Sequence, residues 1–272
     1  MLMPTAPGVA RCINDLAEVD YTNRNDGYIT ARYTGPLDAK CIAQVMCGNF
    51  SQKFKIIDSL PKTIPLCYGN GDYTVLIVAK PDDQGAALIR AMACKFTVVS
   101  CGPLSPYLYP NVYCDYTESS LCVQAANKAC VALDTDTARF NAIYRWVVDN
   151  IEYDRELARR LTTGEESSWW IPDPDSVVVS GLGICWGYAS LIAAMCRSQG
   201  IPCKICVGRA AGAGLHAWNE VYLTHAGKVG KLKVDPNEWM HIDVTFLDSG
   251  KESDSIISYA GDKSNYSTEY YG

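Results

Sequence analysis

The residues from Gly183 to Pro202 constrain the fold more than any other part of the chain, because they form one long helical pattern with a clear start and stop. Apolar side chains recur three and four residues apart, which is the spacing of one helical face. They are Tyr188, Leu191, Ile192, Met195 and Cys196. Gly200 and Pro202 then supply a stop. The pattern predicts a buried helix with Cys185 in its first turn.

The position of Cys185 has a chemical consequence. The first turn of a helix carries unpaired N–H groups and the positive end of the helix dipole, and both favour a thiolate. A reactive cysteine is therefore expected at Cys185. The alternative is that Cys185 is a small apolar residue among the thirteen cysteines of the chain.

Four short motifs follow one another in order. They read G-x-C-x-x-Y-A-x-L from Gly183, R-x-x-G-I-P from Arg197, H-A-W-N-x-V from His216 and W-x-x-x-D-x-T from Trp239. Together they resemble the transglutaminase-like superfamily, bacterial members included, over roughly residues 121–248. The resemblance implies a papain-like cysteine acyl-transfer fold.

The motifs also supply a catalytic triad. Acyl transfer by cysteine requires a thiolate, an imidazole that protonates the leaving amine, and a group that orients the imidazole. Cys185, His216 and Asp243 are assigned to these roles, with His216 and Asp243 expected on paired neighbouring strands. His241, two residues from Asp243, is the competing histidine, whereas His225 is expected at the solvated surface.

The oxyanion of the tetrahedral intermediate needs hydrogen-bond donors. The backbone N–H of Cys185 is the natural first donor. Transglutaminases that resemble this chain use an aromatic side chain upstream of the nucleophile, which makes Trp169 and Trp170 candidates for the second. The alternative is that both rings only pack, in a segment (residues 163–180) that looks too irregular for a regular element and is expected to border the cleft.

The predicted function is cysteine-dependent acyl transfer at an amide bond through a thioester, with peptide or amide hydrolysis favoured. The first alternative is a protein-glutamine gamma-glutamyltransferase, in which an amine replaces water and cross-links proteins. The second is a binding module that keeps the fold without turnover. In either enzyme the expected partner is a protein or peptide substrate, with no cofactor and no metal.

Composition excludes other classes. The net charge of −6, with no basic run, argues against nucleic acid as a partner. No stretch approaches the roughly 20 apolar residues that span a bilayer, so we expect a soluble chain without membrane insertion. The start lacks the features of a signal peptide. Resemblance to bacterial members, many of which are exported, leaves the compartment open, including the cell envelope with the signal peptide absent from this chain.

The expected fold class is α+β, with a helix that bears the cysteine packed on an antiparallel sheet and a small all-β domain before it. Residues 1–102 are predicted to form a β-sandwich-like domain, with Asn70-Gly71 as a hairpin signal. Residues 103–272 are predicted to form the catalytic domain, which ends in a polar, tyrosine-rich tail over residues 249–272. A strand is expected from Trp239 to Phe246.

Two metal hypotheses are weaker. Cys203 and Cys206 form a C-x-x-C, yet strand alternation sends them to opposite faces, which disfavours zinc. The carboxylate pairs Asp82-Asp83 and Glu165-Glu166 lie in polar turns and are expected to be solvated rather than bound to calcium. Most of the cysteines are read as buried thiols.

Overall fold

The computed structural model describes residues 1–36, 40–80, 88–249 and 253–272. They fold into two compact units, residues 3–112 and residues 113–272 with Met1–Leu2. The predicted boundary lay after residue 102. Residues 103–112 pack with the first unit instead, where the Val112 N–H donates to the Thr63 carbonyl at 3.1 Å.

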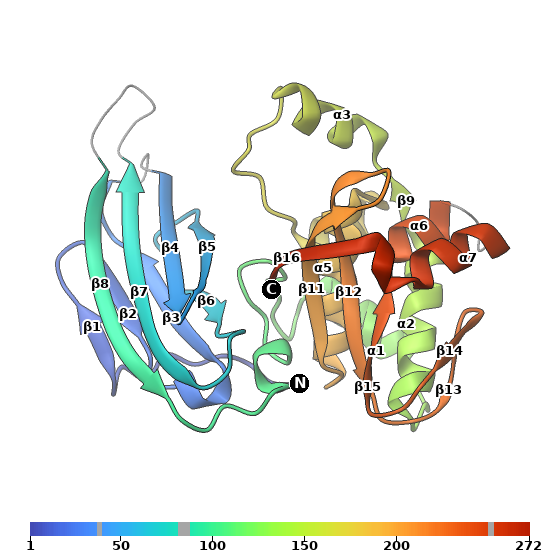
Figure 1. Ribbon diagram of the computed structural model, residues 1–272, viewed down its shortest axis with the longest axis horizontal. Coiled ribbons are helices and arrows are strands. Elements are labelled where there is room, and N and C mark those ends of the chain that lie inside the picture. Colours follow the sequence, from blue (N-terminus) through green and yellow to red (C-terminus); the bar gives the residue numbers. More distant parts are fainter. Residues whose placement is uncertain (37–39, 81–87, 250–252) are drawn as a thin grey trace. The chain divides into compact units, whose positions relative to one another are not determined.

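The first unit is built from two antiparallel sheets (Figure 1). In spatial order, one contains β1 (Arg11–Ile13), β2 (Ala17–Asp20), β3 (Tyr28–Tyr33) and β6 (Lys62–Pro65), and the other β5 (Phe50–Ile56), β4 (Lys40–Cys47), β7 (Gly71–Lys80) and β8 (Ile89–Val98). Two 3-10 turns, η1 (Arg24–Asp26) and η2 (Ser105–Tyr107), complete the described elements. Alternate residues of β4 and β7 are buried, so one face of their sheet forms the core.

One hairpin turn that was predicted in this unit does not form. A hairpin turn lies at Gly48 and Asn49, between the paired ends of β4 and β5, and Gly48 has a φ of +56° that glycine adopts without strain. The hairpin expected at Asn70-Gly71 is wrong. The strands on either side, β6 and β7, belong to different sheets.

One disulfide, between Cys12 of β1 and Cys94 of β8, joins the two sheets. The two cysteines lie 82 residues apart, and no spacing in the sequence predicts their pairing. The remaining cysteines are free thiols and most are buried, as expected.

The second unit contains the helices and a central antiparallel sheet (Figure 1). The helices are α1 (Leu121–Ala129), α2 (Asp136–Asn150), α3 (Arg155–Thr163), α4 (Pro174–Ser180), α5 (Cys185–Ser198), α6 (Val244–Ser249) and α7 (Asp254–Gly261), with the turn η3 (Lys263–Asn265). The central sheet has the order β15 (Glu238–Ile242), β12 (Gly214–Leu223), β11 (Cys203–Ala210) and β16 (Tyr266–Tyr271). Two small ladders pair β9 (Glu152–Tyr153) with β10 (Leu182–Gly183), and β13 (Gly227–Val229) with β14 (Leu232–Val234). The predicted α+β class is confirmed.

Helix α5 is the buried centre of this unit. It packs on β11 and β12, and α1, α2 and α4 pack against it. Every residue from Gly187 to Ser198 is buried. The helix ends as predicted, because Gly200 adopts a φ of +72° and the Ile201 N–H bonds back to the Cys196 carbonyl at 2.9 Å.

Two segments hold more regular structure than expected. Within the irregular stretch 163–180, Asp173 caps α4 by accepting from the Asp175 N–H, and Pro174 occupies its first turn. The predicted tail forms α7 and then β16, which pairs with β11 at the edge of the sheet. Its polar composition follows from its edge position.

Arg197 locks α5 to the sheet from inside the core. Its side chain is 0% exposed. The guanidinium donates to the Cys203 carbonyl from Nε at 3.0 Å and Nη2 at 2.6 Å, and to the Gly272 carbonyl at 2.7 Å. The charged group is thus satisfied by carbonyls at the start of β11 and just after β16.

Replacing Arg197 with Met should lower the free energy of unfolding of this unit by roughly 2–5 kcal/mol, because buried carbonyls lose their donors. Urea unfolding followed by tryptophan fluorescence measures the change, since all six tryptophans lie in this unit. Arg209→Met is the matched control. Arg209 is 70% exposed and pairs with Glu269 at 3.5 Å, so its loss should cost less than about 0.5 kcal/mol. Equal losses in the two variants would contradict the assignment.

Candidate active site

The nucleophile candidate, Cys185, is the first residue of α5 and is half-buried. The parallel pairing of Gly183 with Tyr153 holds the chain just before it. The first backbone hydrogen bond of the helix runs from the Tyr188 N–H to the Ile184 carbonyl at 3.0 Å. The N–H groups of residues 185–187 therefore have no acceptor within the helix, and the sulfur lies at the positive end of its dipole.

His216 and Asp243 are in direct contact. Nε2 of His216 lies 2.7 Å from Oδ2 of Asp243, and the side chains are 6% and 0% exposed. The Phe246 ring stacks on the imidazole with ring centres 4.6 Å apart. Cys185 also interacts electrostatically with His216. Because Nε2 faces Asp243, Nδ1 is the ring nitrogen left for the sulfur.

Asp243 reaches His216 by a route that differs from the predicted strand pairing. Strand β15 ends at Ile242, which pairs with Asn219, and Asp243 lies between that strand and α6. Its Oδ1 accepts the Phe246 N–H at 3.2 Å, which caps the first turn of α6. The strand expected from Trp239 to Phe246 is therefore present as far as Ile242 and is wrong beyond it. The cap leaves Oδ2 directed to the imidazole.

These contacts determine the charge of the imidazole. Burial lowers the pKa of His216, but the hydrogen bond to Asp243 and the negative charges of Asp243 and Cys185 outweigh burial. The net effect raises its pKa from 6.5 to about 10. His216 is therefore an imidazolium at neutral pH, which is the form that stabilises a neighbouring thiolate.

The other two histidines occupy different environments. Burial lowers the pKa of His241 to about 4 despite the charges of Asp243 and Glu220, and its Nε2 has no hydrogen-bond partner among the described residues. His225 is exposed, as predicted, and its Nδ1 lies 2.9 Å from Asp136 Oδ1. The histidine that meets Asp243 is thus His216 rather than His241.

The two tryptophans proposed as oxyanion donors lie in the segment between α3 and α4 and are half-buried. The Trp170 ring packs edge-on against Trp186, with ring centres 6.1 Å apart. The backbone N–H groups of Trp169 and Trp170 bond to Ser167. Trp170 thus packs beside the residue that follows the nucleophile.

Two residues near the site escaped the sequence analysis. Burial and the charge of Cys185 raise the pKa of Tyr153, which pairs with Gly183, two residues before the cysteine. Tyr266 donates to Asp243 Oδ2 at 2.9 Å. Tyr153 lies in Asn150–Asp154, which resembles the segment that precedes the cysteine motif in transglutaminase-like proteins. The sequence therefore carried a signal for Tyr153. Tyr266 lies in the tail, where many tyrosines made no single one distinctive.

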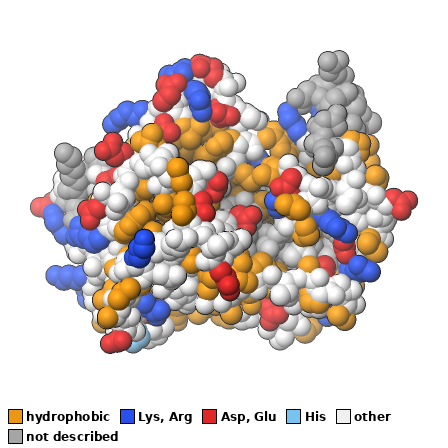
Figure 2. Space-filling view, turned by 180° about the vertical axis from the view of Figure 1, so that it is seen from behind, with side chains coloured by type: hydrophobic (Ala, Val, Ile, Leu, Met, Phe, Trp, Pro, Cys, Tyr) orange, Lys and Arg blue, Asp and Glu red, His pale blue; other side chains and the backbone are white. Residues whose placement is uncertain are grey.

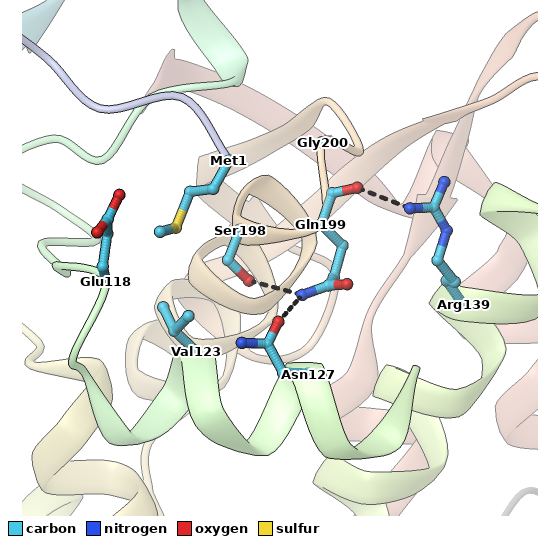
Figure 3. Close-up of a pocket in the computed structure, with 8 residues that line it drawn as sticks. All are labelled: Met1, Glu118, Val123, Asn127, Arg139, Ser198, Gln199 and Gly200. Atoms are coloured by element: carbon cyan, nitrogen blue, oxygen red, sulfur yellow. Dashed lines mark hydrogen bonds between the residues drawn. The ribbon is translucent and has the colours of Figure 1, made fainter. Parts of the chain in front are cut away.

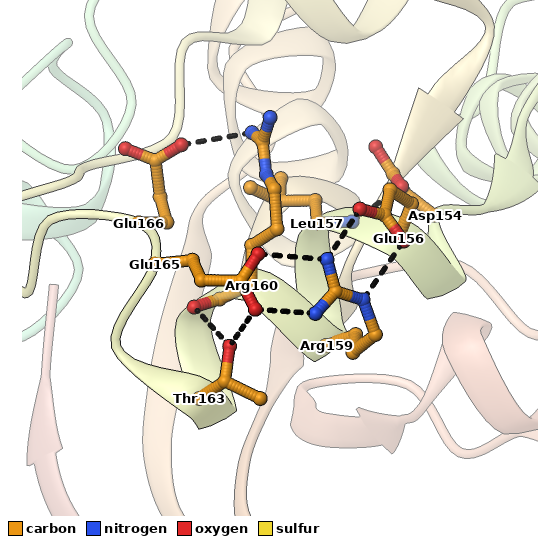
Figure 4. A network of polar contacts seen from close by, with 8 residues as sticks. All are labelled: Asp154, Glu156, Leu157, Arg159, Arg160, Thr163, Glu165 and Glu166. Carbon is orange, nitrogen blue, oxygen red and sulfur yellow. Dashed lines mark hydrogen bonds and ion pairs between the residues drawn. The ribbon is translucent and has the colours of Figure 1, made fainter.

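Of the two carboxylate pairs, Glu165-Glu166 lies among the described residues, and both of its members form ion pairs. Glu165 pairs with Arg159 at 2.5 Å and Glu166 with Arg160 at 2.8 Å, around the end of α3 (Figure 4). Acidic and basic side chains mingle on the surface at the top of Figure 2, over α3. Asp82-Asp83 lies outside the described residues.

Across residues 1–36, 40–80, 88–249 and 253–272, no group of three or more His, Cys, Asp or Glu side chains gathers as metal ligands would. Cys203 and Cys206 are buried within β11. Among the same residues, no helix is both long and apolar enough to cross a membrane.

A cavity of about 430 Å³ lies at the far end of α5 from Cys185, against α1 and α2 (Figure 3). Its polar side chains bond to one another, with Gln199 Nε2 donating to Asn127 Oδ1 at 2.8 Å and Arg139 Nη1 donating to the Gln199 carbonyl at 3.0 Å. Helix α5 has 14 residues, so about 20 Å separates its ends. This cavity is distinct from the cysteine site.

The raised pKa of His216 makes stability depend on pH. The favourable contribution of the imidazolium is fully present below about pH 6.5 and is lost as the pH rises through about 10. The melting temperature of the wild type should therefore exceed that of His216→Gln most at about pH 6, and the excess should shrink towards about pH 10. Thermal unfolding followed by tryptophan fluorescence measures it. His225→Gln, at an exposed position, is the control, and an excess that grew with pH would contradict the assignment.

Comparison with known proteins relates this geometry to a family. Residues 124–244 match the model of the Transglutaminase-like superfamily. Over 100 residues the chain is 32% identical to the kyphoscoliosis peptidase of Homo sapiens and 33% identical to that of Mus musculus. Each match covers 33% of this chain but 14% of the relative, so the chain spans a small part of these proteins.

Solved structures give weaker likenesses. A candidate cysteine protease from Cytophaga hutchinsonii has a TM-score of 0.44 at 16% identity, covering 97% of this chain and 74% of that one. The transglutaminase of red sea bream has a TM-score of 0.34 at 13% identity, covering 80% of this chain and 48% of that one. The match at residues 124–244 contains the cysteine at the start of α5, the histidine of β12 and the aspartate before α6. This part of the chain is a domain of the transglutaminase-like superfamily.

Proposed function

We propose that the second unit is a cysteine-dependent acyl-transfer enzyme that hydrolyses a peptide or amide bond. The observation that carries the proposal is the buried 2.7 Å contact between His216 and Asp243, with Cys185, at the start of α5, acting electrostatically on His216. A thiolate, a protonated imidazole and an orienting carboxylate are the groups that this reaction needs.

In the first half-reaction, the Cys185 sulfur attacks the carbonyl carbon of the amide and forms a tetrahedral oxyanion. His216 gives its Nδ1 proton to the leaving nitrogen, the C–N bond breaks, and the acyl group stays on the sulfur as a thioester. Asp243 keeps the imidazole oriented through Nε2. In the second half-reaction, neutral His216 takes a proton from water, the resulting oxygen attacks the thioester, and the thiolate leaves.

Hydrolysis is favoured over amine transfer because the curated proteins that match part of this chain are named peptidases. With an amine as acceptor, the same thioester would give a new amide, which is the cross-linking alternative. A binding module would form no thioester. These three functions differ in the fate of the acyl group, so one assay separates them.

Cys185 should react with iodoacetamide at about pH 6, where ordinary thiols with a pKa of about 8.5 react slowly. Peptide mass spectrometry of the native protein measures labelling at each cysteine. Cys67 and Cys101 are internal controls, since they are the other half-buried free thiols, and burial raises the pKa of Cys101. Labelling of Cys185 should fall at least about tenfold in His216→Ala and persist in His241→Ala. Equal labelling of the three cysteines would count against the ion pair.

The acyl acceptor is identified with a mixed peptide digest in ¹⁸O-labelled water, with and without added hydroxylamine. Hydrolysis places one ¹⁸O in each new carboxyl group, whereas amine transfer yields hydroxamates at the expense of acids. Cys185→Ala should abolish both products. A wild-type protein with a reactive Cys185 but neither product would favour the binding module.

We propose that the backbone N–H of Cys185 and the hydroxyl of Tyr153 donate the hydrogen bonds that stabilise the oxyanion, in place of Trp169 or Trp170. Tyr153 pairs with Gly183, two residues before the nucleophile, and burial and the charge of Cys185 raise its pKa, whereas Trp170 packs on Trp186. Tyr153→Phe should lower kcat roughly 10²-fold with little change in KM, as expected for a lost oxyanion donor. Trp169→Phe is the comparison in the same peptide assay. A larger loss of kcat in Trp169→Phe would reverse the assignment.

A further inference from the structure

Tyr266, the first residue of β16, shares one oxygen of Asp243 with His216. Its hydroxyl donates to Oδ2 at 2.9 Å, and Nε2 of His216 lies 2.7 Å from the same oxygen. The other oxygen, Oδ1, accepts the Phe246 N–H at 3.2 Å. The carboxylate therefore has three donors, of which two compete for Oδ2.

The environment of Tyr266 keeps its hydroxyl a donor. Its ring centre lies 4.9 Å from that of Trp218 and 4.4 Å from that of His241. Burial raises the pKa of Tyr266, and so do the charge and the hydrogen bond of Asp243. The phenol thus stays protonated while His216 titrates.

The pairing of β16 with β11 places Tyr266 near the triad. Tyr266 pairs with Ala210 of β11, and the register shifts between Val207 and Gly208. A Cβ atom at Gly208 would lie 2.0 Å from the Ser267 carbonyl oxygen, so only glycine allows β16 to approach this closely. The pairing of β16 with β11 therefore determines the backbone position of Tyr266.

The competition for Oδ2 favours one protonation state of His216 over the other. When His216 is protonated, its positive charge compensates the buried carboxylate, and the phenol adds little. When His216 is neutral, the carboxylate is uncompensated, and the hydrogen bond from Tyr266 becomes stronger. The phenol thus stabilises the neutral-imidazole state more than the imidazolium state.

We propose that Tyr266 is a positioning residue that limits the basicity of His216 by donating a hydrogen bond to the oxygen of Asp243 that His216 also uses. In the reaction proposed above, on which this role rests, His216 must release its proton to the leaving amine. An imidazolium that is too basic is a weaker acid and slows that step. Tyr266 keeps the proton transferable while Asp243 keeps the ring oriented.

The test follows the titration of His216 directly. The chain has only three histidines, so ¹³C-histidine labelling gives three ring signals, which His225→Asn and His241→Asn assign. Tyr266→Phe should raise the midpoint of the His216 titration by about half a pH unit, so that less neutral imidazole is present at about pH 10. Incorporation of 3-fluorotyrosine at position 266, a stronger donor, should lower the midpoint instead.

Tyr270→Phe is the matched control, because Tyr270 lies on the same strand but its ring packs against Tyr113, with ring centres 6.2 Å apart, and the change should leave the midpoint unchanged. A midpoint that is unmoved or lowered in Tyr266→Phe overturns the proposal, even if kcat falls. The titration needs no substrate, so absence of turnover in the wild type would refute the proposed function while leaving this test intact. The fluorotyrosine protein keeps the test decisive should Tyr266→Phe fold poorly.

Discussion

The hydrogen bond between His216 and Asp243 is the contact around which the second unit is arranged. Both side chains are buried, so neither charge is stable there without the other. The sheet carries the histidine on β12, while the start of α6 carries the aspartate, and Phe246 of α6 stacks on the imidazole. A small displacement of α6 would therefore disturb the capping bond, the stacked ring and the ion pair together.

Asp243 performs two tasks that depend on its position between a strand and a helix. One carboxylate oxygen accepts the Phe246 N–H and so caps the start of α6, and the other is hydrogen-bonded to the imidazole. This division of tasks explains why Asp243 does not sit within the strand that was expected from Trp239 to Phe246. A carboxylate at a helix start is held by backbone N–H groups, which makes it a more rigid acceptor than one on an open strand.

Local rules predicted much of the fold. The apolar stripe and the Gly200 stop predicted α5, because residue periodicity and helix-stop residues report local burial and local chain ends. The same rules failed where partners are distant. Asn70-Gly71 reads as a hairpin but joins strands of different sheets, and the disulfide between Cys12 and Cys94 has no local signature. The tail looked polar because an edge strand keeps exposed residues, yet it carries Tyr266 to Asp243.

The sequence alone determined that a cysteine begins a buried helix and that a histidine and an aspartate follow in motifs of the transglutaminase-like kind, because these facts depend on residue type and short spacing. The motif favoured His216, but only the tertiary structure showed that His216 and not His241 meets Asp243, since both histidines lie on strands of one sheet. It also decided that Tyr153 pairs with Gly183, just before Cys185, and that Tyr266 shares Asp243 with His216. These contacts join residues tens of positions apart, and only the pairing of strands and the capping of α6 bring them together.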